Sequence, residues 1–554
     1  MLIQIGVSAH SLKLLLHHCS PEPCTPADDE HMEATVLLLT LLLIPVIIMC
    51  TLLLHSSRST KSRRPSRAAT VPPSPWRLPL VGNLHQLAGG NLPHRTLAAL
   101  AAAHGPVMLL RLGQVRAVVV SSARAAREVM QTKDHIFATR PSLAIPSKLF
   151  YGCTDVAFAP HGPYWLHARK TSVLHLLSPA RVRAYRAVRE EEVAALVRKV
   201  RLRACDGAGG VVPVSELLAG FAKDVIGRIV FGTSAATRAE GWGAKVDALL
   251  EEGNALLGTF HVGDYFPSLA WVAALDGTDA KVAKAFERID RVLEEIVDAA
   301  ESRMAVNGGG EALQQQDSTF VDVLLSLGQI SAGAKKAEWL FSRDNVKALL
   351  ANLFGAGADS TIIVLEWVMA ELLHNKGAME RLQHELRYAN TDSQTDNLIT
   401  EDDLQGTVYL KAVIKETMRL HPPGPLLIPR EAMEPTSIQR YDVDSKTMVI
   451  VNAWAIGRDP DTWECPEEFR PERFLGSEVD FQGHHFELIP FGSGRRVCPG
   501  INFTMSIMEV TIANLVARFD WALPEVAAEV DMEEAPGITS RKRVPLHVLA
   551  TPQE

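Results

Sequence analysis

The loop from Phe491 to Gly500 constrains the fold of this chain more than any other stretch of its sequence. It reads Phe-Gly-Ser-Gly-Arg-Arg-Val-Cys-Pro-Gly, and the residues from Ile501 onward are apolar on nearly every face. Such an all-round apolar pattern predicts a deeply buried helix. Pro499 suits the first position of that helix, where the N–H that proline lacks is not needed. We therefore expect Cys498 at or next to the N-cap of a buried helix.

The surroundings of Cys498 favour a thiolate. Free amide N–H groups at a helix start and the positive charge of the nearby Arg496 both stabilise a deprotonated sulfur. A buried thiolate needs compensation, which a metal would supply, and Gly492 and Gly494 would let the backbone approach a flat, bulky group. Two other interpretations stay open on these residues alone. Cys498 could be a small core residue, or the Gly-Ser-Gly stretch could cradle a phosphate, although the full G-x-G-x-x-G spacing is missing.

Residues 34–54 form an apolar run without a charged side chain. At about 1.5 Å per residue the run would be about 30 Å long, enough to cross the hydrocarbon core of a bilayer. A buried helix of a soluble protein is the alternative. Basic residues favour the cytoplasmic side of a membrane, and here they follow the run, at Arg58, Lys61, Arg63, Arg64 and Arg67. The sequence thus predicts a single-pass anchor with the following domain in the cytosol.

The anchor divides the chain into four predicted parts. Residues 1–33 are an N-terminal extension, and because Met32 would open the anchor directly, we expect residues 1–31 to be an upstream extension rather than working protein. Residues 34–54 are the transmembrane anchor. Residues 55–80 are a basic and proline-rich linker, which the prolines should keep stiff and extended. Residues 81–554 are a single catalytic domain.

The pattern of the domain is mainly α-helical with a few short strands. Helical spacing covers residues 181–203, 279–304, 343–375 and 402–419, a hairpin is expected at 105–122, a strand at 446–457, and loop-like inserts at 308–317 and 390–397. The net charge of −8 gives no reason to expect a nucleic acid partner. The seven cysteines are scattered and contain no C-x-x-C pair, which argues against a disulfide framework and a zinc site.

The residues of the cysteine loop together resemble a known family. The pattern F-x-x-G-x-R-x-C-x-G, filled by Phe491, Gly494, Arg496, Cys498 and Gly500, resembles the haem-binding loop of the cytochrome P450 monooxygenases. The stretches FATRP, YWLHARK, KETMRL and PERF precede the loop, and they occur in the same order as in the family. The resemblance runs from the anchor to about Lys542 and is closest to plant microsomal members of the A-type class. It implies the cytochrome P450 fold, mainly α with small β-sheets, behind the N-terminal transmembrane helix.

The resemblance also implies the site residues. The thiolate of Cys498 would be the axial ligand of haem b, held in the loop with Phe491 and Gly500. Trp165, Arg169, Arg430 and Arg496 would meet the haem propionates, and Glu416, Arg419 and Arg473 would form a buried network behind the loop. Asp359, Ser360 and Thr361 resemble the oxygen-activation motif, in which Ser360 replaces the usual threonine. Each piece also has a plainer interpretation: exposed E-x-x-R pairs are common, and Ser360 could bond back to its own helix.

The implied function is a monooxygenase that takes electrons from NADPH through NADPH–cytochrome P450 reductase. Arg495 and Lys170 are candidates for the reductase surface, and the endoplasmic reticulum membrane is the expected location. Pocket segments would fall near residues 141–160, 253–266, 350–361, 424–429 and 536–541, which are mainly apolar. Dioxygen, membrane lipid and a small to medium lipophilic substrate of plant specialised metabolism are the expected partners. The alternative is a non-oxygenating haem protein, either an isomerase or dehydratase type of member or a haem-binding scaffold.

Overall fold

The computed structural model describes residues 70–88, 92–205, 210–232, 243–306, 318–333, 341–388, 398–525 and 529–553. The chain divides after Thr70, and Val71–Glu554 form one compact unit. The expected N-terminal extension, the anchor at 34–54, linker residues 55–69 and the inserts at 308–317 and 390–397 lie outside the described residues. Linker residues from Val71 onward belong to the compact unit, where the Pro73 carbonyl accepts a hydrogen bond from the Leu109 N–H at 2.8 Å.

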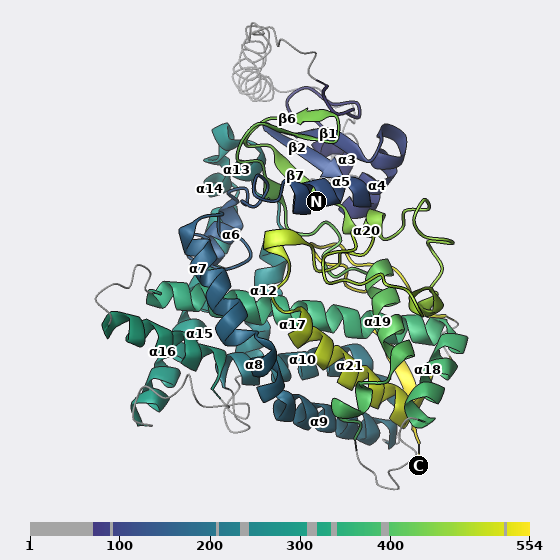
Figure 1. Cartoon of the computed structure of the whole chain (residues 1–554). Helices are drawn as coiled ribbons and strands as arrows, with labels where there is room; N and C mark the ends of the chain where they lie inside the picture. The colour runs from purple at the N-terminus through teal and green to yellow at the C-terminus, as the bar shows by residue number, and fades with distance from the viewer. Residues whose placement is uncertain are drawn as a thin grey trace, which may run out of the picture. The chain divides into compact units, whose positions relative to one another are not determined.

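Helices make up most of the compact unit (Figure 1). They are α3 (Leu84–Leu87), α4 (Pro93–His104), α5 (Ala123–Arg127), α6 (Ala144–Leu149), α7 (Pro163–Thr171), α8 (Pro179–Ala184), α9 (Arg186–Cys205), α10 (Val214–Phe231), α12 (Gly243–Leu257), α13 (Val262–Tyr265), α14 (Val272–Leu275), α15 (Thr278–Val306), α16 (Phe320–Gly333), α17 (Arg343–His374), α18 (Lys376–Tyr388), α19 (Val408–Leu420), α20 (Ala453–Ile456) and α21 (Ile501–Arg518). Short π-helical turns at Glu128–Thr132 and Ser172–Leu176, and 3-10 turns at Pro267–Leu269, Asp402–Leu404, Pro471–Phe474 and Gly494–Arg496, lie between them. The predicted mainly helical class is confirmed.

Nine short strands form three small sheets among the described residues. They are β1 (Val107–Leu112), β2 (Val115–Val120), β3 (Val211–Pro213), β4 (Arg430–Glu431), β5 (Thr436–Ile438), β6 (Tyr441–Val443), β7 (Met448–Val451), β8 (Phe519–Ala522) and β9 (His547–Pro552). The strand orders are β1-β2-β7-β4, β3-β9-β8 and β5-β6. In Figure 1, β1, β2, β6 and β7 lie at the top with α3 to α5, above α9, α10, α17, α19 and α21.

The predicted hairpin at 105–122 is confirmed as the antiparallel pair β1–β2. Its turn needs a glycine, because Gly113 has φ +61° and a Cβ there would lie 2.6 Å from the Tyr265 carbonyl oxygen. The predicted strand at 446–457 is shorter, since β7 ends at Val451. The side chain of Asn452 then accepts from the Ala455 N–H and starts α20.

The predicted helices agree with the structure apart from two breaks. The patterns at 279–304 and 343–375 correspond to α15 and α17, whereas the pattern at 181–203 is split into α8 and α9 at Tyr185. The helix predicted at 402–419 begins only at Val408, after a 3-10 turn. Gly406, a poor helix former, separates that turn from α19.

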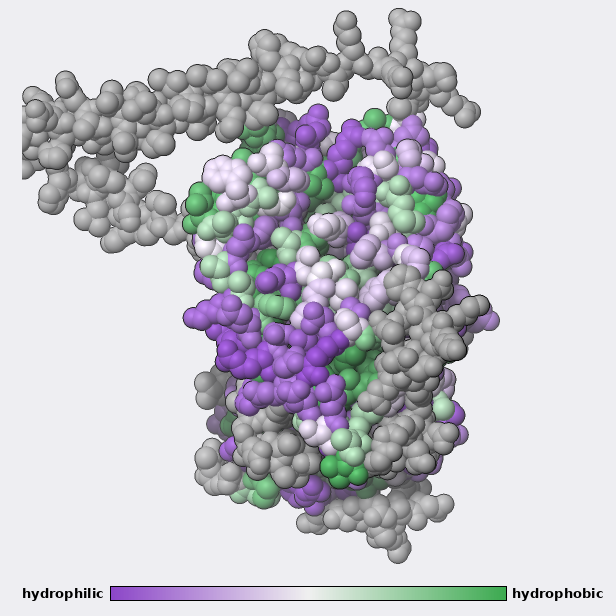
Figure 2. All heavy atoms as spheres, turned by 90° about the vertical axis from the view of Figure 1, so that its left-hand side faces the viewer, coloured by the Kyte–Doolittle hydropathy of each residue, from purple (hydrophilic) through white to green (hydrophobic). Residues whose placement is uncertain are grey.

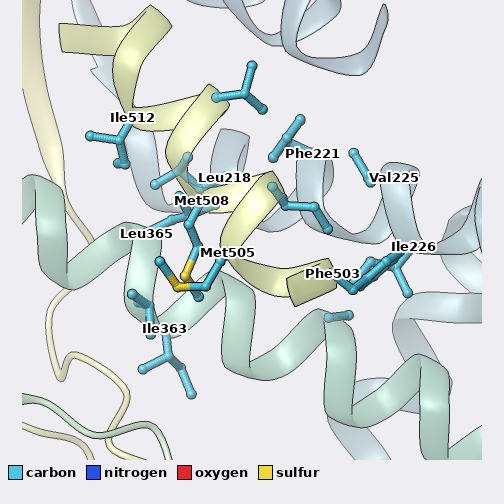
Figure 3. Packing of buried hydrophobic residues seen from close by; sticks show 14 of the residues in the cluster. Leu218, Phe221, Val225, Ile226, Ile363, Leu365, Phe503, Met505, Met508 and Ile512 are labelled. Carbon is cyan, nitrogen blue, oxygen red and sulfur yellow. The ribbon is translucent and has the colours of Figure 1, made fainter. Parts of the chain in front are cut away.

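Helices α10, α17 and α21 build the centre of the core. Figure 3 shows how their apolar side chains interdigitate: Leu218, Phe221, Val225 and Ile226 come from α10, Ile363 and Leu365 from α17, and Phe503, Met505, Met508 and Ile512 from α21. Within the described residues, α17 is the one helix that is long and apolar enough to cross a bilayer. Most of it is buried in the protein, however, so that α17 is a core helix. The cysteine loop, which precedes α21, is thereby fixed to the rigid centre of the fold.

Candidate active site

The cysteine loop joins the 3-10 turn Gly494–Arg496 to α21. Its backbone is closed by the Cys498 N–H, which donates to the Phe491 carbonyl at 3.0 Å. Helix α21 begins at Ile501 with Gly500 as its N-cap, so the prediction that Cys498 lies at or next to the N-cap is wrong, and Pro499 is not helical. The Gly500 N–H, which as a helix-start group has no partner within the helix, donates to the Cys498 Sγ at 3.4 Å.

Gly492 and Gly494 of the loop have different reasons to be glycine. Both have left-handed φ angles, +69° at Gly492 and +70° at Gly494. A Cβ on Gly494 would lie 1.9 Å from the Met130 carbonyl oxygen, so this glycine lets the loop pack against another backbone segment. A Cβ on Gly492 would make only ordinary contacts. The predicted close approach to a flat group therefore applies at most to Gly492.

The protein alone does not favour a thiolate at Cys498. Burial raises the pKa of the thiol, and this effect outweighs the Gly500 N–H and the positive charge of Arg169, which lower it. The cation that acts on the thiol is Arg169 rather than the predicted Arg496, and desolvation dominates, so the expectation that a buried thiolate needs compensation stands. A thiolate here needs a positive group bound to the sulfur itself.

Two of the predicted propionate ligands, Trp165 and Arg496, meet beside the loop. Arg496 lies with its Cζ 4.0 Å from the centre of the Trp165 ring. Its guanidinium donates to the carbonyls of Ala138, Val156 and Ala159 at 2.7, 3.2 and 2.6 Å. The Trp165 Nε1–H, on the buried face of α7, also donates to the Val156 carbonyl, at 3.0 Å. Both side chains are thus held by the protein's own backbone.

The other two predicted propionate ligands differ from each other. Arg430, on β4, donates to Asp134 Oδ1 at 3.0 Å and to the Ser493 carbonyl at 2.8 Å. Arg169 follows Trp165 by one turn of α7 and is half-buried. Among the described residues, Arg169 has neither a hydrogen-bond nor an ion-pair partner, and the negative charge that acts on it is that of Cys498.

Sequence reasoning missed a fourth arginine, Arg140. It is buried, and it donates to the carbonyls of Ala157, Ile428 and Pro429 at 2.8, 2.6 and 2.9 Å. Arg140 belongs to the FATRP stretch, which supports the resemblance to the family, but a single arginine before a proline carries no signal of burial. We call Arg140, Arg169, Arg430 and Arg496 the arginine cluster.

The arginine cluster carries excess positive charge. Burial and the neighbouring guanidinium groups lower the pKa of Arg496 to about 9 and that of Arg140 well below its usual range. The carboxylates that act on Arg140 and Arg496 are those of Asp134 and Asp155, both buried. Asp134 also pairs with the exposed Arg495, so the two carboxylates do not balance the four guanidinium groups of the cluster. A haem group carries two propionates, so the residues beside Cys498 fit the group that the family binds.

The predicted Glu416, Arg419 and Arg473 come together in a buried network. Arg419 forms a bidentate pair with Glu416, at 2.7 and 2.8 Å, and both side chains are fully buried. Arg473 donates to Glu416 Oε1 at 3.0 Å. The remaining donors of both arginines bind backbone carbonyls, among them those of Gly457 and Glu468. The network therefore ties α19 to the segment before the cysteine loop.

The oxygen-activation stretch lies in the middle of α17. Ala356 is exposed although Phe354 and Ala358 are buried, so one side of the helix borders accessible space here. Ser360 Oγ donates to the Ala356 carbonyl at 2.8 Å, as in the plainer interpretation of this residue. Thr361 is fully buried and donates to the Gly357 carbonyl at 2.7 Å.

Asp359 has a partner that the sequence did not suggest. Its buried carboxylate forms an ion pair with Arg541, from the segment that precedes β9. Burial raises the pKa of Asp359, whereas Arg541 and a hydrogen bond from Thr539 lower it. The separation of 182 positions between the two partners explains why no local pattern indicated this pair.

The segment that carries Arg541 is fixed at its other end by Glu534. This buried carboxylate accepts from His94 Nε2 at 2.9 Å and from Arg95 Nε at 3.0 Å. Although burial opposes ionisation, His94, Arg95 and His421 lower the pKa of Glu534 to about 2, from an ordinary value of 4.5. Its charge thus stabilises the folded state above about pH 4.5, and this contribution is lost as the pH falls toward 2.

We therefore expect Glu534→Gln to lower the free energy of unfolding by about 3 kcal/mol at pH 7. The difference from the unsubstituted protein should shrink as the pH falls below about 4.5. Urea unfolding over a pH series measures both quantities. Glu533→Gln, which removes an exposed partner of Arg543, is the matched control and should cost less than about 1 kcal/mol. A loss for Glu534→Gln that does not change with pH would contradict the assignment.

Comparison with known proteins identifies the family. The model of the cytochrome P450 family matches residues 72–548. Cytochrome P450 71A4 of Solanum melongena is 43% identical over 92% of this chain and 98% of its own length. Norfluorocurarine oxidase of a Strychnos species is 43% identical over 88% of this chain and 94% of its own. A zebra fish cytochrome P450, solved with abiraterone, superimposes with a TM-score of 0.68 at 26% identity, covering 84% of this chain and all of that one. The chain therefore belongs to the cytochrome P450 family, as a monooxygenase of the plant A-type class.

Proposed function

We propose that this chain is a haem-thiolate monooxygenase that hydroxylates a small to medium lipophilic molecule in plant specialised metabolism. The observation that carries the proposal is the arginine cluster beside Cys498, whose positive charge exceeds that of its two carboxylates and would be balanced by the propionates of haem b. Haem bound to the Cys498 thiolate would supply the activation of dioxygen, with electrons that come from NADPH through NADPH–cytochrome P450 reductase.

The residues of the cysteine loop and the arginine cluster would hold the haem. Cys498 would bind the iron through its sulfur, and Phe491 and Gly500 shape the loop around this sulfur through the two N–H bonds described above. Arg169, which has no other partner among the described residues, would meet a propionate directly. Arg430 and Arg496, together with Arg140, would do so with donor groups left after their bonds to the protein, whereas Trp165, whose single N–H is bound to the Val156 carbonyl, would support Arg496 by its ring.

Residues of α17 would carry out proton transfer. Ser360 keeps the hydroxyl of the usual threonine but lacks its methyl, so its χ1 angle is less restricted. Its bond to the Ala356 carbonyl fixes the hydroxyl beside the accessible part of the helix. Asp359 would hold and release the proton that Ser360 passes on, with Thr361 supporting the helix from its buried side.

Membrane attachment would combine the anchor at 34–54 with exposed apolar side chains of the compact unit. Trp76, Leu80, Trp271 and Leu275 are more than half exposed. Gln114, in the β1–β2 turn, binds the Tyr265 carbonyl and Ser268, which links the hairpin to the segment before α14. Figure 2 shows a face on which hydrophobic residues are dispersed in the upper part and a broad hydrophilic area lies below. These features support a domain on the cytosolic surface of the endoplasmic reticulum.

The reductase would approach the side of the cysteine loop. Arg495, at the end of the loop's 3-10 turn, and Lys170, next to Arg169 on α7, are both exposed. Arg495 also donates to Asp134, the partner of Arg430, so a surface cation is connected to the arginine cluster. A basic surface at this place suits an acidic electron-transfer partner.

The function is tested by turnover with purified reductase, NADPH and isotopically labelled dioxygen, using a set of indoles, terpenes and phenylpropanoids. We expect NADPH-dependent formation of a product that contains one labelled oxygen atom. Conversion without NADPH or label would favour an isomerase or dehydratase instead. Full haem loading without turnover of any candidate would favour a haem-binding scaffold.

The ion pair between Asp359 and Arg541 gives a second test. Arg541→Gln leaves the buried carboxylate without its positive partner, so the pKa of Asp359 should rise further. We expect the acid limb of the pH profile of product formation to move to higher pH and less product to form per NADPH consumed. Arg541→Lys keeps the positive charge, so its pH profile and its product yield per NADPH should lie between those of the unsubstituted protein and of Arg541→Gln. An unchanged pH profile in Arg541→Gln would show that Asp359 takes no part in proton transfer.

A further inference from the structure

The segment 155–159 connects three groups of the haem-binding side. Its carbonyl oxygens accept from Arg140, Arg496 and Trp165: Ala157 binds Arg140, Val156 binds both Arg496 and Trp165, and Ala159 binds Arg496. No two of these donors come from the same element of the fold. The conformation of one short turn therefore sets the position of two cluster arginines and the indole.

Asp155 determines the conformation of this turn. Its Oδ2 accepts from the Ala157 N–H at 2.9 Å and from the Phe158 N–H at 3.0 Å, an arrangement that bends the chain back on itself. The side chain is completely buried. Its second oxygen, Oδ1, has no hydrogen-bond partner among the described residues. Arg140 and Arg496 are the cations whose charge interacts with the carboxyl group.

We propose that Asp155 is a positioning residue of the haem site, which orders the turn that holds Arg140, Arg496 and Trp165 and supplies part of the cluster's counter-charge. The proposal rests on haem binding as described above. The hydrogen bonds of Asp155 go to the turn and not to Cys498, so Asp155 would affect the haem through Arg140, Arg496 and Trp165. The cost of burying it supports this role, because burial raises the pKa of Asp155 to about 6 despite two backbone hydrogen bonds and Arg140.

Two substitutions separate the two parts of this role. The side chain introduced by Asp155→Asn is not charged, but its amide oxygen can still accept both backbone N–H bonds, so the turn should persist. Asp155→Ala removes the charge and the turn together. Asp322→Asn is the control, since Asp322 also accepts backbone and hydroxyl hydrogen bonds, from Thr319, but lies at the start of α16.

The measurements are the haem midpoint potential and the rate of haem transfer to apomyoglobin, both on the purified haem-loaded chain. In Asp155→Asn the potential should become more positive, because a negative charge near the haem is lost, while haem transfer stays close to that of the unsubstituted protein. In Asp155→Ala haem transfer should be at least about tenfold faster, the size expected for one lost hydrogen bond to a charged group. Asp322→Asn should change neither quantity.

The results distinguish this proposal from the function on which it rests. If the unsubstituted chain takes up no haem, the proposed function fails, whatever Asp155 does. If it takes up haem and Asp155→Asn leaves the potential unchanged, Asp155 supplies no counter-charge and the proposal is overturned. If Asp155→Ala retains haem as well as the unsubstituted chain does, the turn does not position the donors, and the proposal is overturned also.

Discussion

Replacing Cys498 with serine should abolish the red-shifted Soret band of the reduced carbon monoxide complex. The band reports a thiolate opposite the carbon monoxide, and a serine hydroxyl cannot replace the electron donation of sulfur. The substitution is nearly isosteric, and the backbone bonds that close the loop, between Cys498 and Phe491, do not involve the side chain. The expected loss is therefore one of ligand chemistry and not of the fold.

Cys465→Ser is the matched control for this substitution. Cys465 is a free and exposed cysteine in the segment that binds Arg473, so its replacement removes a thiol without touching the loop. We expect its reduced carbon monoxide spectrum to equal that of the unsubstituted chain. A red-shifted band that survives in Cys498→Ser would exclude Cys498 as the axial ligand and, with it, the proposed function.

Replacing Glu416 with glutamine should destabilise the protein by about 3–5 kcal/mol, the cost of leaving a buried charge without its partner. Arg419 is fully buried and has no other carboxylate within bonding distance among the described residues. Arg473 would lose the same counter-charge, whereas the amide oxygen of glutamine can still accept from the Arg470 N–H, which donates to Glu416 Oε1 at 2.7 Å. The midpoint of urea unfolding of the haem-loaded chain measures the loss.

Glu472→Gln serves as the control for Glu416→Gln. Glu472 lies in the same 3-10 turn as Arg473, but its pair with Arg381 is half-exposed on both sides. An exposed pair of this kind contributes at most about 1 kcal/mol. If the two glutamine variants were equally stable, the buried network would contribute no more than a surface ion pair, and its role behind the cysteine loop would be refuted.

The sequence predicted the buried helix that follows Cys498 and the pair of Glu416 with Arg419, because both depend on residues that are close together in the chain. The loop motif, the apolar helix that follows it and the E-x-x-R pair each occupy a few consecutive turns, and local patterns of this kind can be read from one chain. The same holds for the hairpin β1–β2, whose turn is specified by Gly113. The start of α21 was predicted incorrectly: the helix begins at Ile501, and the N–H of its N-cap residue Gly500 donates to the Cys498 sulfur.

What the sequence could not predict depends on residues far apart in the chain. Arg140 reaches carbonyls at positions 428 and 429, and Asp359 pairs with Arg541. Neither residue has a neighbour in sequence that indicates its partner. The extent to which burial raises the pKa of the Cys498 thiol is non-local as well, since the degree of burial depends on packing of the whole domain rather than on the loop.

The pairing of Glu534 with His94 has a consequence for synthesis on the ribosome. The two residues are 440 positions apart, and ribosomes add about 5–20 residues per second. Roughly 20–90 s therefore pass in which His94 has been added but Glu534, its hydrogen-bond partner, does not yet exist. Strand β3 likewise cannot pair until its partner β9 has been synthesised, and β9 is the last strand of the described residues. The nascent chain thus stays unfinished until translation is nearly over, which makes its carboxyl end a poor place for truncation.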